Sequence, residues 1–200
     1  ARGMLDEAAR ELAAGVAAQG RGGADSAFSG VALHWLLGLI HLSRQEGAQA
    51  LAEFDRELAN EAIGHLYSRE CCANTWYAIG AWHLRHARTA DAVAAFDHAL
   101  QRVPKHALAQ LGRSAAAGAP TPSAGAHFRP SGAMDQAVFI AAGHVLAGSH
   151  AEAARVVDEA LSAAPTSNAA WVLPVEPLLN VGAAPAAWAS ALARLSARAL

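Results

Sequence analysis

Apolar and small residues recur along this chain with the three- and four-residue spacing of amphipathic helices, most clearly in residues 73–104. Gly80 lacks a side chain and lets a second helix approach closely, while Ala92 and Ala99 place two small side chains on the facing stripe. Phe96 then fills the space between those alanines, and Pro104 ends the helix. The pattern predicts two closely packed helices, and its landmarks are Trp76, Ile79, Gly80, His83, Ala92, Phe96, Ala99 and Pro104.

The same pattern recurs on both sides of this stretch. Upstream it comprises Leu37, Gly38, His41, Ala50 and Phe54. Downstream it comprises Ile140, Ala141, His144, Ala153, Val157, Ala160 and Pro165, and a weaker copy runs from Trp171 to Leu192. The opening LDEAARELAAGVAAQ is typical of the second helix of a pair whose first helix is missing, which indicates a fragment of a longer protein.

These patterns predict an all-α protein, since runs typical of strands are few. The expected helices cover residues 4–18, 27–45, 48–65, 68–87, 89–103, 105–117, 133–147, 149–163 and 185–199.

Two segments interrupt the regular pattern. Residues 118–133 are rich in Gly, Pro and Ser and predict one long loop, which leaves the helix at 105–117 without its own second helix. Either the loop replaces that second helix, or the helix at 133–147 packs against the helix at 105–117 as its partner. Pro174 and Pro177 predict a kinked or shortened helix at 171–181, which with the last helix forms an atypical C-terminal cap.

The landmarks of residues 73–104 resemble the tetratricopeptide repeat (TPR), with His83 in a position where that family has tyrosine. The resemblance extends over about 31–199. It implies a right-handed α-α superhelix, a TPR-like solenoid of four to five repeats. The expected divisions are a truncated repeat at 1–20, repeats at 31–65 and 73–104, a partial repeat with the loop at 105–133, a repeat at 134–165 and a degenerate cap at 168–200.

The resemblance also implies a concave groove, lined by the first helices of successive repeats, that binds a peptide or a partner helix. The residues carried over to this groove are Trp35, Leu39, Ser43, Asn74, Tyr77, Ala81, Arg85, Val138 and Ala142, with Leu146 beyond them. Only Asn74 and Arg85 match the basic and amide residues with which some family members clamp a terminal carboxylate, so a carboxylate clamp is not expected.

The groove is therefore expected to be mainly aromatic and apolar. It suits an amphipathic helix, an apolar peptide or a segment of the chain itself. In the alternative interpretation, neighbouring helices cover Trp35 and Tyr77. The loop with His127, Phe128 and Arg129 is a candidate plug over the groove.

Composition and charge narrow the possible partners. The 200 residues are 54% hydrophobic, largely alanine, and carry a net charge of −2 with a single lysine, Lys105. Because binding a phosphate backbone requires a basic surface, no nucleic acid is expected. The longest apolar stretch, at 31–42, is shorter than the roughly 20 residues of a transmembrane helix, and no leader segment is visible, so we expect a cytoplasmic protein without membrane contact.

The histidines and cysteines are the candidates for chemistry. Among 10 histidines, His41, His83 and His144 share one position in three repeats, which favours packing, with a hydrogen bond from the ring to a nearby carbonyl. The alternative, a zinc site, needs three or four converging ligands. Cys71 and Cys72 are adjacent, which favours one buried and one partly exposed thiol over a redox pair.

A glycine-rich stretch at 20–30 lacks the ending of a phosphate-binding loop, so Asp25 or Ser26 is expected only to cap a helix. We therefore expect no catalytic residue, no metal and no cofactor. The function hypothesis is a non-enzymatic protein-interaction scaffold, the regulatory part of a larger bacterial-type protein. The alternatives are a homodimerisation module and a histidine-based metal or enzyme site.

Overall fold

The computed structural model describes residues 4–21, 32–63, 67–119, 132–163 and 168–198. Within these ranges the chain is all-α: nine α-helices, three short 3-10 helices and no strand. The elements are α1 (Leu5–Arg21), α2 (Leu33–Ser43), α3 (Gly47–Ala59), η1 (Asn60–Ile63), α4 (Ser68–Arg85), α5 (Thr89–Arg102), α6 (Ala107–Ala116), α7 (Ala133–Leu146), α8 (His150–Ala163), η2 (Asn168–Val175), η3 (Val181–Ala183) and α9 (Pro185–Ala197).

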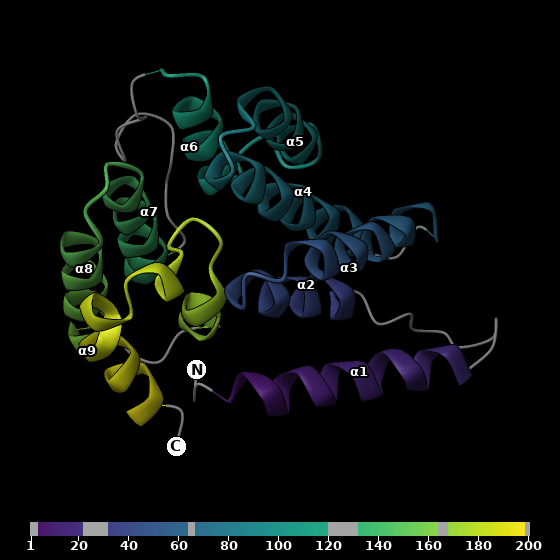
Figure 1. Cartoon of the computed structure of the whole chain (residues 1–200), viewed down its shortest axis with the longest axis horizontal. Helices are drawn as coiled ribbons and strands as arrows, with labels where there is room; N and C mark the ends of the chain where they lie inside the picture. The colour runs from purple at the N-terminus through teal and green to yellow at the C-terminus, as the bar shows by residue number, and fades with distance from the viewer. Residues whose placement is uncertain (1–3, 22–31, 64–66, 120–131, 164–167, 199–200) are drawn as a thin grey trace.

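The helices pack mainly as consecutive pairs. α2 lies on α3, α4 on α5, and α7 on α8, while α1 packs on α2 and α9 packs on α8 (Figure 1). α6 lies against both α4 and α5 and has a smaller contact with α7. The helix at 107–116 is thus packed mainly against the preceding pair rather than against α7.

All nine predicted helices are found, with most ends within about three residues of the expected positions. The prediction of one long helix over 48–65 is wrong: α3 ends at Ala59, and the narrower 3-10 helix η1 follows it. The start predicted for the second helix is also wrong: α2 begins at Leu33, and the left-handed backbone of Ala32 (φ 75°) prevents one continuous helix from residue 27. Two expectations lie outside the described residues, namely the cap at Asp25 or Ser26 and the plug carrying His127, Phe128 and Arg129.

Close contacts between glycines and phenylalanines hold the helix pairs together, as the sequence predicts. A Cβ atom on Gly80 would lie 2.7 Å from the Phe96 ring, and one on Gly112 of α6 would lie 2.4 Å from the same ring. Gly38 has the same relation to Phe54, at 2.3 Å. Both phenylalanine side chains are completely buried. The missing side chains therefore set the distance between the helices.

Replacing Gly80 with alanine is expected to lower the free energy of unfolding by about 1–2 kcal/mol. The overpacking against the Phe96 ring outweighs the better helix propensity of alanine. The control is Gly143→Ala in α7, because an added Cβ there meets nothing within 4 Å. That variant is expected to gain about 0.5–1 kcal/mol. Urea unfolding followed by circular dichroism measures both, and equal effects of the two substitutions would contradict this account.

α2, α4 and α7 end in the same way. In each, the carbonyl oxygen of a histidine accepts a hydrogen bond, at 2.8–3.0 Å, from the backbone N–H of the fifth residue after it. The fourth residue after the histidine has a left-handed backbone. The histidines are His41, His83 and His144, and the left-handed residues are Gln45 (φ 62°), Ala87 (φ 56°) and Gly148 (φ 82°). α6 ends in the same way, with Ser114 at the place of the histidine and Gly118 (φ 63°) as the left-handed residue, so helices with and without the histidine share this ending.

The segment from 168 to 183 forms two 3-10 helices instead of the kinked or shortened helix predicted at 171–181. Its first part, η2, is a 3-10 helix that contains Pro174. η2 contacts α2, α7 and α9 (Figure 1). Leu173, Leu178 and Leu179 are buried in the main core. Besides preceding the last helix, this segment therefore packs against α2 and α7.

Candidate functional site

The residues carried over to the groove lie on α2, α4 and α7, and most of them are covered. Buried are Leu39, Tyr77, Ala81, Val138 and Ala142; half-buried are Trp35, Ser43 and Asn74; Arg85 is exposed. The hydroxyl of Ser43 donates to the carbonyl oxygen of Ile40 at 2.7 Å. The structure brings Asn74, Tyr77, Ala81 and Arg85 together as one stripe on α4.

The chain's own segment 173–180 binds this stripe. The Tyr77 hydroxyl donates to Oε1 of Glu176, which is 99 residues later in the sequence. Arg85 Nη1 donates to Oδ1 of Asn180 at 2.9 Å, across 95 residues. Glu176 Oε1 also accepts the backbone N–H of Leu178 at 3.2 Å. Two polar contacts thus fix the segment to α4 at points two helical turns apart.

Tyr77 and Glu176 are shielded from water, and this burial changes the pKa of both side chains. Burial raises the pKa of Tyr77 well above its usual value, and the neighbouring Glu176 carboxylate raises it further. Burial also raises the pKa of Glu176, opposed by the hydrogen bonds from Tyr77 and Leu178 and by the charge of Arg85. The tyrosine therefore stays protonated and remains a hydrogen-bond donor at neutral pH.

Asn74, at the other end of the stripe, contacts α6. His106 precedes α6, and its Nδ1 accepts the backbone N–H of Ala109 at 3.2 Å, which caps the helix. Its Nε2 therefore carries the proton and donates to Oδ1 of Asn74 at 3.0 Å. The rings of His106 and Tyr77 lie 4.9 Å apart. Burial lowers the pKa of His106 to about 4, so the ring is neutral at physiological pH.

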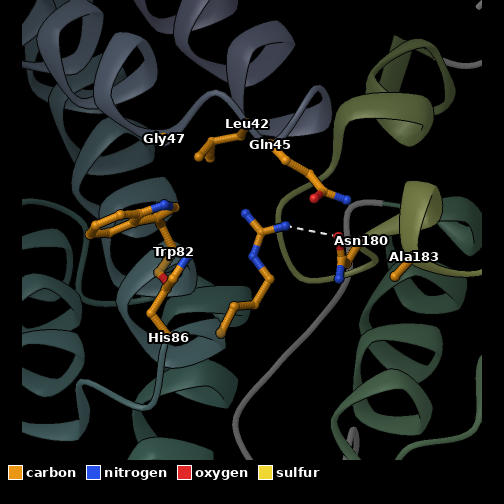
Figure 2. A pocket seen from close by; sticks show the side chains of 8 residues that line it. Leu42, Gln45, Gly47, Trp82, His86, Asn180 and Ala183 are labelled. Atoms are coloured by element: carbon orange, nitrogen blue, oxygen red, sulfur yellow. Dashed lines mark hydrogen bonds between the residues drawn. The ribbon is translucent and has the colours of Figure 1, made fainter.

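An open pocket of about 310 Å³ lies beyond the Arg85 end of the stripe. Its walls come from the turn between α2 and α3, the end of α4 and the turn between η2 and η3. They comprise Leu42, Gln45, Gly47, Trp82, Arg85, His86, Asn180 and Ala183. Figure 2 shows Trp82 and His86 on one side of the pocket and Gln45 and Asn180 on the other. Sequence segments far apart in the chain thus form one concave site.

The three equivalent histidines make different contacts. His41 Nδ1 lies 2.6 Å from a carboxylate oxygen of Glu46. His83 Nδ1 is buried without a hydrogen-bond partner, 3.8 Å from Asp91, and burial lowers the pKa of this histidine. The predicted ring-to-carbonyl bond is therefore wrong for His41 and His83. Instead, His83 packs its ring edge-on against Trp82, with ring centroids 5.0 Å apart.

Among the described residues, no group of three or more His, Cys, Asp or Glu side chains is arranged to hold a metal ion. Cys72 is buried and Cys71 is half-buried, as predicted. Burial, followed by the nearby acidic side chains, raises the pKa of each thiol to about 11. At neutral pH little thiolate is present, so neither cysteine is an activated nucleophile.

The sequence did not single out Glu176, Asn180, Gln45 or Trp82 as site residues. Glu176 and Asn180 lie in the segment assigned to the cap, and nothing in the pattern links them to α4. Gln45 occupies the same position in the turn after α2 that Gly148 occupies in the turn after α7. Aligning the two turns is the one step by which the sequence could have singled out Gln45.

Comparison with known proteins gives no match: no protein-family model, no curated protein and no solved structure matches this chain. Among the helices that the structure describes, none has the combination of length and hydropathy needed to cross a bilayer. The described helices and this site together define an all-α chain in which α4 binds a segment of the same chain beside an open pocket.

Proposed function

We propose that this chain is a TPR-like, right-handed α-α superhelix and acts as a non-enzymatic cytoplasmic scaffold for protein binding. Its ligand is a polypeptide segment bound along the inner stripe of α4. The same helix ending recurs after α2, α4, α6 and α7, which supports a repeated helical architecture. The binding function is supported most directly by one observation: Tyr77 holds Glu176 of the chain's own segment on this stripe.

The internal segment supplies both kinds of contact that a bound peptide would use. Leu173, Leu178 and Leu179 bury apolar side chains, each worth about 1.5–3 kcal/mol relative to exposure. The hydrogen bonds of Glu176 and Asn180 add direction and fix the register. An external partner must displace this segment. The apparent affinity of the partner is therefore reduced by the free energy with which the segment docks.

A synthetic peptide of residues 171–183 tests this function in trans. The parent chain is expected to bind it weakly, while Glu176→Ala is expected to bind it about 5- to 10-fold more tightly, because one internal contact of about 1 kcal/mol is lost. Fluorescence anisotropy of the labelled peptide measures both affinities.

Glu152→Ala is the matched control, since Glu152 is an acidic residue whose hydrogen-bond partner on α8 is Arg155, away from the stripe. This variant should bind the peptide as weakly as the parent does. If the peptide binds none of the three proteins, or binds the parent and Glu176→Ala equally well, peptide binding on this stripe is wrong.

A further inference from the structure

The pocket beside Arg85 has the chemistry of a small-molecule site. We propose that it binds a small carboxylic acid that carries a flat apolar group. This proposal goes beyond the protein-binding function, because the ligand is a free acid and the pocket is open while the internal segment stays docked. It therefore stands or fails separately from the peptide experiment.

The charge of the pocket favours an anion. Arg85 is the one residue with a permanent charge among those lining it, and no carboxylate contributes to the walls. Within the described part of the chain, the hydrogen bond of Arg85 goes to the neutral amide of Asn180. The nearby carboxylate of Glu176 is already bound by Tyr77 and Leu178. A ligand carboxylate could therefore form a direct hydrogen-bonded ion pair with the guanidinium, which Glu176 influences only through its charge.

The polar side chains around Arg85 include groups that can donate hydrogen bonds. Asn180 Oδ1 is used by Arg85, which leaves the NH₂ group of that amide for a ligand. Gln45 adds a second amide on the same side of the pocket (Figure 2). A guanidinium and two amide NH₂ groups together suit the two oxygens of a carboxylate, whereas a cation would meet the charge of Arg85.

The remaining walls and the size of the pocket define the rest of the ligand. Leu42, Ala183 and the indole of Trp82 supply apolar surface next to the donors. The volume of about 310 Å³ lies at the lower end of the range for ligand sites. These dimensions fit a single aromatic ring with its carboxylate.

Both amide residues of the pocket have a backbone that glycine would adopt more easily. Gln45 has φ 62° and Asn180 has φ 43°, and they are two of the four described residues other than glycine with positive φ. After α7 the position of Gln45 is occupied by Gly148. Such strain is concentrated at functional sites, where the side chain has a use that offsets the conformational cost.

Isothermal titration of the full chain with benzoate, and with benzamide as the neutral isostere, tests the proposal. Benzoate is expected to bind with a Kd on the order of 1 mM, and benzamide at least 10-fold more weakly. Arg85→Gln keeps an N–H donor but removes the charge, and should weaken benzoate binding at least 10-fold.

Gln45→Gly separates ligand binding from folding. It should raise the melting temperature, because glycine suits the left-handed position, and should still weaken benzoate binding several-fold. Ala87→Gly, at the equivalent position after α4 and outside the pocket lining, should raise the melting temperature without changing the Kd. Equal binding of benzoate and benzamide, or unchanged benzoate binding by a folded Arg85→Gln, would overturn the proposal.

Discussion

Replacing Phe96 with alanine is expected to lower the free energy of unfolding by about 3–5 kcal/mol, the range for truncating a fully buried phenylalanine. The ring is completely buried and lies between Gly80 of α4 and Gly112 of α6. Because these two close neighbours are glycines, they have no side chains that could move into the cavity. Urea unfolding monitored by circular dichroism measures this loss, provided that the variant remains folded without denaturant.

A double-mutant cycle shows whether the loss arises from the predicted contact. Phe96→Leu leaves room beside Gly80, so Gly80→Ala should destabilise a Phe96→Leu background less than it destabilises the parent. The expected coupling between the two substitutions is about 1 kcal/mol. Strict additivity of the two effects would mean that the ring does not set the distance between the helices.

The helices and their closest contacts were predictable because they depend on neighbours in the sequence. Gly80 and Phe96 lie on consecutive helices, and the spacing of small and aromatic residues along each helix is enough to pair them. The loss of regular α-helix at 171–181 followed from the missing backbone donors of Pro174 and Pro177, although the segment forms a 3-10 helix and not a kinked α-helix. The end of α3 was not predictable, since residues 60–63 continue the helical pattern but form a 3-10 turn.

The polar contacts of the site were not predictable from the same patterns. Glu176 and Asn180 bind α4 across more than 90 residues, and such pairs leave no periodic signal in a single sequence. Glu57 is a second example. This completely buried carboxylate accepts the backbone N–H groups of Ala32 and Trp35 and thereby caps the start of α2, 25 and 22 residues earlier. Long-range polar contacts like these depend on the assembled fold.

Asn74 and Tyr77 on α4 contact both the start of α6 and the segment 173–180. Tyr77 binds Glu176 on one side and packs its ring on His106 on the other, while Asn74 binds His106 directly. The cap of α6 and the internal segment therefore share one face of α4. A change in the protonation of His106 should therefore alter the docking of the segment through the ring of Tyr77.

Lowering the pH from 7 to 4.5 is expected to reduce the stability of the parent chain, with His106 contributing about 2–3 kcal/mol of the loss. Burial lowers the pKa of His106 from 6.5 to about 4 in the folded state. Between these two values the unfolded chain binds the proton and the folded chain does not, so stability falls as the pH falls. The penalty is absent above about pH 6.5 and complete below about pH 4. Urea unfolding at several pH values measures it.

His106→Asn isolates this contribution from the other titrating groups. Asparagine is a favourable helix cap, so its amide oxygen can replace Nδ1 as the acceptor for the Ala109 N–H without binding a proton in this range. The variant should therefore lose about 2–3 kcal/mol less than the parent between pH 7 and 4.5, although both lose stability through shared groups. An NMR titration of the His106 ring should give a folded-state pKa near 4. Parallel pH profiles for the two proteins, or a ring that titrates near 6.5, would show that His106 is not held neutral by its burial between α4 and α6.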